Sequence, residues 1–540
     1  MKKLLAGVAA SALTFPGIAS AAPQPSPDEL LKRLEELTKE LQTVKEQLEE
    51  VKNTHEETKE TVIEVSEQVD EIVTDGVARL DLSGDYRFRL DSARADTHSY
   101  WSAQTIETAM SAFEGMGYTQ EQINAMLSSM SAEQRAAMLQ SMGYSKTKGY
   151  DADNDTLYTN RLRLNLKADA TENVSFKGRL AMYKIWGMEK ANATASPFFG
   201  NNGFYWDPNV SRRPNDDTLR VEMAYVNWTN IGGLPIWFSV GRRPTVDGPP
   251  LNLKLNIDKR YATPVGLGVD WTFDGATLGY AYEDPFPGKI RICYGRGYES
   301  GFKDIPGEDK LDDVDLIGVN WDVIDDKDEN LFANLQLFKA GDIPDFLSNE
   351  NIWGLPEEPT GQLGDIYHLS GIFQHQLNGI DWFVSGGLSR TDNRGTGFGG
   401  YGLLNNPGED DNHWGWAAFA GVRVPVEQLN SKIGFEYNYG SQYWINFTPA
   451  ADDLYQAKLS TRGHVGEIYW IWDLPETPLS KYGRAFIRAG YQYYWFDYTG
   501  SGNWLGKPID IDDLDDPMNA QLFAPVDTLD NAYVTFEVYF

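Results

Sequence analysis

Hydrophobic and polar side chains alternate along several segments of the chain, most clearly over its last residues. There Ala532, Val534, Phe536, Val538 and Phe540 stand at every second position, and Phe540 is the terminal residue. Because successive side chains of a strand point to opposite faces, this segment predicts a strand with one apolar face. A final strand of this kind is typical of β-barrels in bacterial outer membranes, where one face meets lipid and the other meets the lumen.

The same alternation returns much earlier in the chain. Between residues 79 and 91, five apolar residues from Leu80 to Leu90 alternate with charged or small residues. Residues 161 to 167 repeat the pattern, with arginine, asparagine and lysine between leucines. A soluble sandwich can also alternate, but its outward face rarely carries so many charges. These segments therefore predict strands with a lipid face and a charged lumen face.

Short turns and long connections follow one another between the predicted strands. Hairpin-type residues place short turns near 170–173, 230–234, 274–275, 325–328, 376–379, 425–430 and 475–482. With the long loops between them, they predict a transmembrane barrel of sixteen antiparallel strands over residues 77–540. Residues 276–283 and 289–298 look like separate strands, but an odd total would put the termini on opposite sides, so we merge them. Eighteen strands are the alternative if residues 454–460 form an extra hairpin.

Two other patterns precede the predicted barrel. Residues 1–21 combine Lys2 and Lys3 with an apolar run and a small-residue cleavage site, as in a secretory signal peptide. Residues 22–76 hold a proline-rich leader and, from 30 to 72, hydrophobic positions spaced alternately by four and three. This heptad pattern predicts a coiled coil, and leucines at a with β-branched residues at d favour three or four strands. We therefore expect a homotrimer with a periplasmic rod of about 65 Å, within reach of the cell wall.

Composition supports export and limits the possible functions. Aromatic residues make up 13% of the chain, which also holds 51 glycines and 16 tryptophans. This profile is common in exported barrels, and a secreted β-rich enzyme is the alternative. The only cysteine, Cys293, excludes an internal disulfide. The net charge of −32 argues against nucleic-acid binding, and we place most of the acidic residues in outer loops that contact lipopolysaccharide through divalent cations.

Known catalytic and metal-binding motifs are missing from the sequence. The six histidines form no His-Glu-x-x-His motif and no Cys/His cluster, and no haem-attachment motif occurs. The acidic residues at 510–516 do not have the spacing of an EF-hand loop. We therefore predict no enzyme activity, no catalytic residue, no metal site and no cofactor. A hydrolase whose serine, histidine and acid converge only in the folded barrel is left open.

The first long loop, residues 92–156, is predicted to be helical. Residues 106–115, 119–130 and 131–142 read as short helices. The last two open with Thr119 and Ser131, each followed three residues later by glutamine, which is the capping-box order. Their methionine-rich faces are expected to pack together as a small lid rather than to bind copper.

Three segments carry a resemblance to a known family. Residues 83–89, 224–228 and 241–250 resemble those of an uncharacterised family of outer-membrane porins with helical first loops, and the resemblance covers nearly the whole mature chain. It implies an outer-membrane channel but no particular substrate. The order of coil and barrel is also similar to that of trimeric sugar and phosphate porins with periplasmic coiled coils.

Charged residues on the predicted lumen face are the candidate functional residues. A barrel of this size is expected to let small hydrophilic solutes or ions diffuse, and a basic wall would favour anions. The third long loop, residues 244–263, is the candidate constriction. The predicted pore-lining residues are Arg87, Arg89, Arg161, Arg163, Lys177, Arg179, Arg220, Arg242, Arg243, Asp247, Lys254 and Arg260. Alternatively, the arginines pair inside the barrel with Asp81, Asp85, Asp91, Asp169 and Glu222.

Two further functions fit the same pattern. A structural tether between outer membrane and cell wall would use the coil and would show no conductance. A barrel that sheaths an electron-transfer complex would co-purify with a haem-containing partner.

Overall fold

The computed structural model describes most of the chain after residue 79. The described residues are 80–187, 217–244, 248–257, 266–270, 272–301, 311–345, 359–448, 453–454, 457–474 and 483–540, with Lys32, Lys39, Gln42, Thr43 and Lys45 nearer the N-terminus. The chain divides into two compact units, Met1–Ala78 and Arg79–Phe540. The five described residues of the first unit are helical. The predicted signal peptide and the rest of the predicted coiled coil lie outside the described residues.

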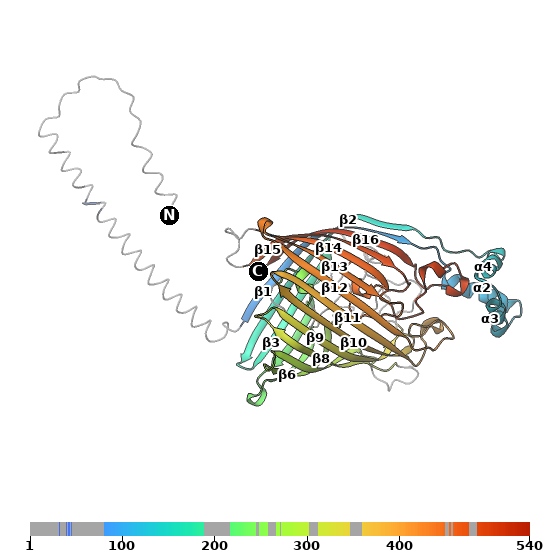
Figure 1. Ribbon diagram of the computed structural model, residues 1–540, viewed down its shortest axis with the longest axis horizontal. Coiled ribbons are helices and arrows are strands. Elements are labelled where there is room, and N and C mark those ends of the chain that lie inside the picture. The colour runs from blue at the N-terminus through green and yellow to red at the C-terminus, as the bar shows by residue number, and fades with distance from the viewer. Residues whose placement is uncertain are drawn as a thin grey trace, which may run out of the picture. The chain divides into compact units, whose positions relative to one another are not determined.

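The second unit is a closed barrel of sixteen antiparallel strands joined in sequence order (Figure 1). The first eight strands are β1 (Leu80–Thr97), β2 (Asp151–Thr171), β3 (Val174–Ile185), β4 (Arg220–Trp228), β5 (Ile236–Pro244), β6 (Thr272–Tyr282), β7 (Gly288–Tyr298) and β8 (Val314–Asp326). The other eight are β9 (Leu331–Pro344), β10 (Gln362–Leu377), β11 (Ile380–Asn393), β12 (Trp414–Val426), β13 (Ser431–Gly440), β14 (Gly463–Asp473), β15 (Arg484–Phe496) and β16 (Val526–Tyr539). The predicted fold class, an all-β barrel with sixteen strands, is confirmed.

The last strand closes the barrel against the first. Phe536 of β16 stands opposite Phe88 of β1, and the ladder continues to the chain end. There the Gly84 amide donates a hydrogen bond to the Phe540 carbonyl at 2.7 Å, and the Phe540 amide donates to the Gly84 carbonyl at 3.0 Å. Closure removes the free strand edges that an open sheet would leave unpaired.

Alternation along the strands puts apolar side chains outside the barrel and most polar ones inside. In β16, Val534 and Phe536 are 44% and 39% exposed, whereas Tyr533 and Thr535, which alternate with them, are 2% and 0% exposed. This confirms the apolar face predicted for the final segment. The outward side chains of the other strands include many large hydrophobic residues, such as Leu278, Ile292 and Leu337.

The predicted division of residues 272–298 was wrong although the count of sixteen was right. The expected turn at Asp274 and Gly275 lies inside β6, where these residues pair with Arg296 and Gly295 of β7. The chain turns instead at residues 283–287, where Pro285 and Pro287 cannot donate ladder hydrogen bonds. The two segments that we merged are therefore separate strands, β6 and β7. Residues 266–270, ahead of β6, are not a strand.

The alternative of eighteen strands finds no support in the described residues. Between β13 and β14, Lys458–Ser460 form a short 3-10 helix rather than part of a hairpin. Lys458, Leu459 and Ser460 are all buried. This connection turns inward because Lys458 pairs with Glu436 and Glu467, and Leu459 packs in a buried apolar cluster of the barrel wall.

The long connection between β1 and β2 forms the three expected helices at one end of the barrel (Figure 1). They are α2 (Ala103–Gly115), α3 (Gln120–Ser128) and α4 (Ala132–Ser141). Both predicted capping boxes, at Thr119 and Ser131, are present. The methionine-rich faces pack around buried Trp101 and Phe113, so the predicted packing of these faces is present. None of the helices that the structure describes is long and apolar enough to cross a bilayer.

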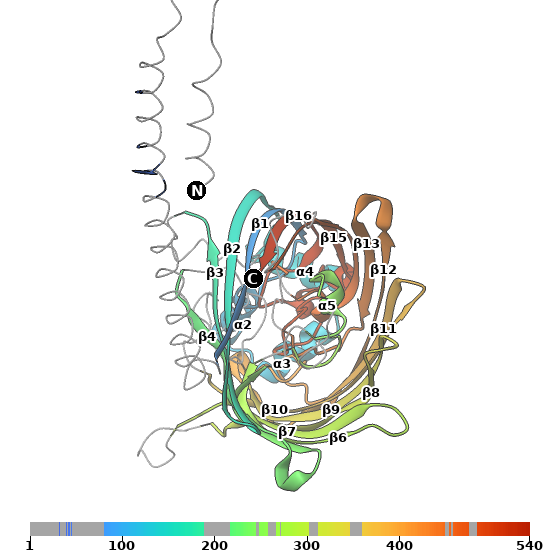
Figure 2. The same cartoon turned by 90° about the vertical axis from the view of Figure 1, so that its left-hand side faces the viewer.

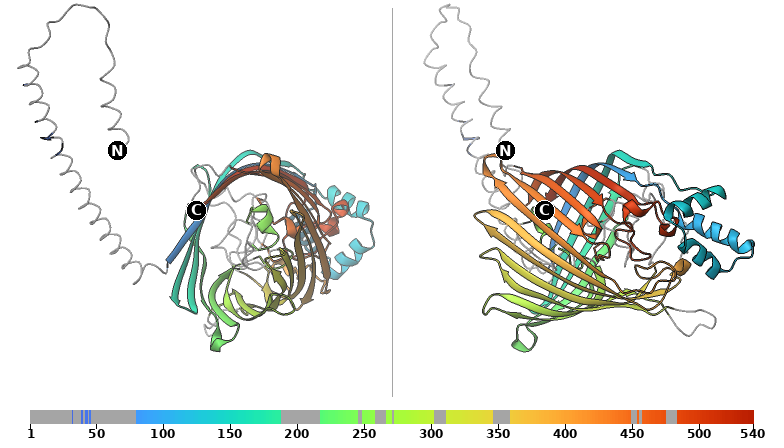
Figure 3. Two further views of the ribbon diagram at one scale, coloured as in Figure 1. Left: turned by 60° about the vertical axis from the view of Figure 1, so that its left-hand side comes forward. Right: turned by 45° about the vertical axis from the view of Figure 1, so that its right-hand side comes forward.

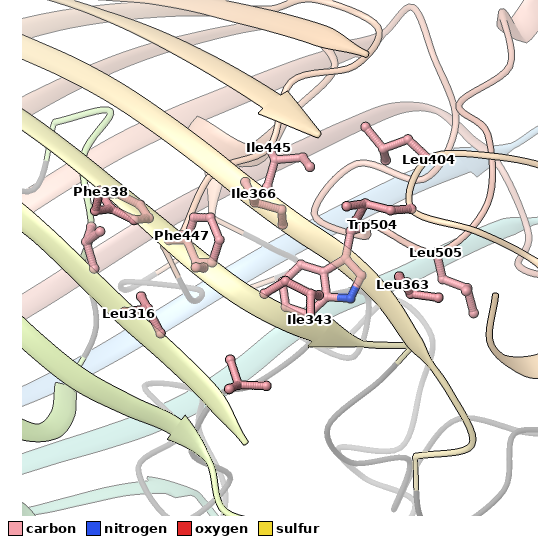
Figure 4. Close-up of a cluster of buried hydrophobic side chains, with 14 of the residues drawn as sticks. Leu316, Phe338, Ile343, Leu363, Ile366, Leu404, Ile445, Phe447, Trp504 and Leu505 are labelled. Carbon is pink, nitrogen blue, oxygen red and sulfur yellow. The ribbon is translucent and has the colours of Figure 1, made fainter. Parts of the chain in front are cut away.

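Several long connections turn into the barrel mouth and pack together there. Their apolar side chains meet inward residues of β8, β9 and β10 in one buried cluster (Figure 4). The labelled members are Leu316, Phe338, Ile343, Leu363, Ile366, Leu404, Ile445, Phe447, Trp504 and Leu505. The lumen is therefore partly filled on this side, and the short helix α5 (Leu251–Lys254) also lies within the ring of strands (Figures 2 and 3).

Candidate functional site

The inner face of β1–β3 carries most of the arginines predicted to line the pore. Arg87, Arg89, Arg161, Arg163 and Arg179 are at most 8% exposed. They stand at alternate positions, opposite the outward apolar face of their strands. Two further predicted residues are half-buried on the same inner face. These are Lys177, two positions before Arg179, and Arg220, which pairs with Ala181 across β3 and β4.

Acidic partners lie beside this basic wall, as the alternative interpretation of the sequence proposed. Asp85 accepts hydrogen bonds from both Arg161 at 3.0 Å and Arg163 at 2.8 Å. The other contacts are Arg89 with Asp91 at 2.6 Å, Arg179 with Glu222 at 3.2 Å, and Lys167 with Asp169 at 2.8 Å and Asp81 at 3.8 Å. One carboxylate therefore serves two arginines at Asp85, and Arg161 also lies 3.8 Å from Glu537 of β16.

The assignment of Arg242 to the pore needs correction. Consecutive strand residues point to opposite faces, so Arg242 and Arg243 cannot both face the lumen. Arg242 shares the outward face of β5 with Val240, which is 47% exposed, and lies 3.4 Å from Asp274, which is 67% exposed. Arg243 faces inward, with its guanidinium carbon 5.9 Å from the ring centre of Tyr225.

The described residues of the third long loop, 248–257, lie inside the barrel (Figure 2). Helix α5 and the residues after it lie against the inner face of the last strands of the barrel. Three arginines of that wall donate to loop carbonyls: Arg423 to Leu253 at 2.9 Å, Arg488 to Lys254, and Arg484 to Asn256. Asp247 and Arg260, also predicted to line the pore, lie outside the described residues.

Lys254 joins a buried cluster of charges that holds the loop in place. Its ammonium lies 2.6 Å from Glu467 of β14. Lys458, from the connection between β13 and β14, pairs with the same Glu467 and with Glu436 of β13. Burial alone would lower the pKa of Lys458, but the nearby carboxylates raise it, so the group stays charged. Burial also raises the pKa of Asp453, which accepts a hydrogen bond from the Lys458 amide at 2.9 Å.

Arg462 links two of the loops that fill the barrel mouth. This side chain is 1% exposed and donates to four backbone carbonyls. The acceptors are Trp444 at 3.1 Å, Thr499 at 3.3 Å, Gly500 at 2.7 Å and Asn503 at 2.7 Å. Burial lowers the pKa of the guanidinium to about 9, so it remains charged at neutral pH. The carbonyl oxygens compensate this charge and fix both loops to each other.

Sequence reasoning missed most of the charges on β12–β15. Glu436 and Glu467 could have been found, because each stands at an inward position next to outward apolar residues such as Phe435 and Ile468. Arg423 and Arg488 follow the same rule. Lys458 and Arg462 offer no such signal, since they lie in a loop without period. Across the described ranges no group of three or more histidine, cysteine, aspartate or glutamate side chains could hold a metal ion.

A family model described as "Protein of unknown function (DUF3373)" matches residues 151–540. The chain belongs to this family. No match was found among the curated proteins. Three solved structures similar to this chain are distant from it in sequence. OprB of Pseudomonas putida has 11% identity and a TM-score of 0.42, over 87% of this chain and 96% of that one. An anion-selective porin from Comamonas acidovorans has 10% identity and a TM-score of 0.39, over 85% and 99%. The outer membrane channel DcaP of Acinetobacter baumannii has 9% identity and a TM-score of 0.36, over 85% and 98%.

Proposed function

We propose that this protein is a porin of the bacterial outer membrane, through which small hydrophilic solutes or ions diffuse with a preference for anions. The observation that carries the proposal is the barrel itself, which is closed, has sixteen strands and turns apolar side chains outward and charged ones inward. In a closed barrel every strand is hydrogen-bonded to a neighbour on both edges, as the bilayer core requires. Sixteen strands enclose an interior wide enough for an aqueous path.

The proposed preference for anions rests on the distribution of charge over the lumen wall. Two arginines share Asp85 on β1 and β2. Arg243 has no carboxylate partner among the described residues, where its contacts are the rings of Tyr225 and Trp237. Charges on the wall of a narrow path act on a permeating ion more strongly than loop charges beyond a Debye length of about 8 Å. The acidic loops, which dominate the net charge of −32, are therefore expected to matter less.

Reversal potentials in a salt gradient test this function directly. Purified protein in planar bilayers should give stepwise ohmic currents. Their reversal potential should have the sign expected for an anion-selective channel. Replacing Arg243 by glutamine should shift that potential towards cations. Arg242→Gln is the matched control, because it removes the same charge from the neighbouring residue on the outward face, and it should leave the potential unchanged.

Each negative outcome has a distinct meaning. Folded protein without any conductance would overturn the porin proposal and favour a tether between outer membrane and cell wall. Conductance with cation preference, or an equal shift in both variants, would overturn the proposed role of the lumen wall while leaving the channel intact.

A further inference from the structure

A pocket in the inner wall combines an apolar surface with unpaired hydrogen-bond donors. It lies against β6–β9 and has a cavity volume of about 80 Å³, which is several times the volume that one water molecule needs. Phe273, Leu316 and Phe338 line its apolar part, together with Val269 of the inward loop. The polar groups that line it are Arg243, Arg291, Asn320 and Gln336.

Glycines in the wall create this hollow. A Cβ at Gly318 would come within 2.5 Å of the Cβ of Phe338, and a Cβ at Gly295 within 3.0 Å of the Cβ of Phe273. Because both positions lack a side chain, the two phenylalanines can lie flat against the strands. Gln336 fixes the other side of the pocket, since its Oε1 accepts a hydrogen bond from the Val269 amide at 2.8 Å.

Two residues that line the pocket each have a buried donor without an acceptor among the described residues. The first donor is the buried Nε of Arg243, whose guanidinium otherwise rests between the rings of Tyr225 and Trp237. The second is Nδ2 of Asn320, a side chain only 2% exposed. Asn320 is held in place because its Oδ1 accepts from Arg291 at 2.7 Å and from Asn334 at 2.8 Å. Arg291 itself is paired with Asp322 at 3.1 Å, so it orients the amide without being the free cation.

We propose that this pocket binds a small organic carboxylate with an apolar body, such as a single-ring aromatic acid. A carboxylate would accept hydrogen bonds from Arg243 and Asn320, which are the two donors left open, and would compensate the buried guanidinium charge. The apolar body would cover Phe273, Leu316 and Phe338. Inorganic anions lack this body, and neutral aromatic alcohols lack the charge. The inference rests on the proposed porin function, since the solute reaches the pocket through the lumen.

The single cysteine of the chain offers a direct measurement. Cys293 lines the same pocket, is partly exposed, and is the only thiol in the sequence. Its rate of modification by the small neutral reagent methyl methanethiosulfonate should fall with rising benzoate concentration in the folded protein. Benzyl alcohol and acetate at the same concentrations should protect Cys293 far less, because each lacks one half of the recognition.

Variants separate the site from a general charge effect. Arg243→Gln should weaken benzoate protection at least about tenfold, as expected for the loss of one charge-assisted contact. Asn320→Asp should also weaken protection, because it exchanges a donor for an acceptor. Arg242→Gln is the matched control and should protect as wild type does. For each variant, the rate of Cys293 modification with benzoate is divided by the rate without it. This ratio does not depend on the intrinsic reactivity of the thiol in that variant.

The outcomes distinguish this site from the channel function. Lack of benzoate protection in folded wild-type protein, or equal protection in Arg243→Gln, would overturn the carboxylate site. If the same preparation conducts in bilayers without protection, the channel stands and the site is wrong. If benzoate protects Cys293 but the protein does not conduct, the site stands and the porin proposal is wrong.

Discussion

Single residues of this barrel show how strongly surroundings decide what an arginine does. Arg242 pairs with exposed Asp274 outside the barrel, while its neighbour Arg243 lies inside against aromatic rings. Arg462 meets neither a carboxylate nor a ring among the contacts described, and binds backbone carbonyls of two loops instead. The same side chain therefore serves as an ion pair on the outward face, a lumenal cation beside aromatic rings and a link between two loops.

Replacing Arg462 by alanine should loosen the barrel mouth and leave the barrel folded. Each buried carbonyl left without a donor costs about 1–3 kcal/mol, but the strand ladder is unchanged. Limited proteolysis of the folded protein should then cut faster within residues 441–448 and 497–506. Arg94→Ala is the control. Arg94 is 66% exposed and lies 3.6 Å from exposed Asp155, and an ion pair in solvent contributes little to stability. Unchanged cleavage in Arg462→Ala would contradict the clamp.

His413 should make the loop before β12 sensitive to acid. Its ring stacks on Tyr443 with centres 4.0 Å apart, and Nε2 lies 2.8 Å from Asn405 Oδ1. Burial lowers its pKa; Lys507 lowers it further, and Asp411 and Glu409 raise it. A histidine with a lower pKa in the folded state contributes full stability above its unfolded pKa of about 6.5 and loses it as pH falls.

Hydrogen exchange between pH 5 and 8, corrected for intrinsic rates, measures this effect. Residues 394–413 should become less protected below about pH 6, since protonation is favoured when the ring is released. The substitution His413→Gln should remove most of this dependence. An identical pH profile in that variant would assign the effect to other groups.

Local sequence signals predict where a strand or turn forms, unless pairing with neighbouring strands favours another structure. Asp274 and Gly275 carry a hairpin signal, yet they lie within β6 and pair on both sides. Gly275 is needed there for close approach, since a Cβ would lie 2.1 Å from the Tyr294 carbonyl oxygen. The helices of the first loop show the opposite case, because their caps bind within the same segment and formed where predicted.

Gly275→Ala should destabilise the pairing of β6 with β7. Overpacking against a backbone atom costs about 1–3 kcal/mol, because the strand cannot move without breaking its ladder. Gly386→Ala in β11 is the control, since nothing lies within 4 Å of the added methyl group there. The temperature at which heating changes the electrophoretic mobility from that of the folded barrel to that of the unfolded chain should fall for Gly275→Ala alone. Equal shifts in both would contradict the close approach to the Tyr294 carbonyl as the cause.

The whole molecule combines a regular wall with irregular contents. The strands form a closed ring in sequence order. Buried charges and an apolar cluster hold several of the loops inside this ring. We propose that assembly beyond one chain depends on a coiled coil of residues 30–72, whose heptads favour three or four helices over two.

We expect the detergent-extracted mature chain to be a trimer held partly by this coil. Deleting residues 30–72 should weaken or abolish assembly, because the a and d positions that would pack between chains are removed. Deleting one complete heptad, residues 48–54, keeps the register and should preserve the trimer. Light scattering checks all three proteins, and a monomer for the intact mature chain would reject the prediction.

Period-two patterning in the sequence was sufficient to predict the barrel and the apolar outer face of β16. These features are local, because alternation is a property of the strand backbone and each strand carries its own signal. The capping boxes at Thr119 and Ser131 were predictable for the same reason. The requirement that both termini lie on one side corrected the strand count without locating the turn at residues 283–287.

Only the tertiary structure decided which lumenal charges meet. Asp85 lies between Arg161 and Arg163 because of the register of β1 and β2, and Lys254 meets Glu467 because a loop after β5 crosses the lumen to β14. Arg243 and Asn320 line one pocket although 77 positions separate 243 from 320 in the sequence. Such contacts depend on pairing between distant segments, and a pattern of period two records which face a residue occupies but not what stands opposite it.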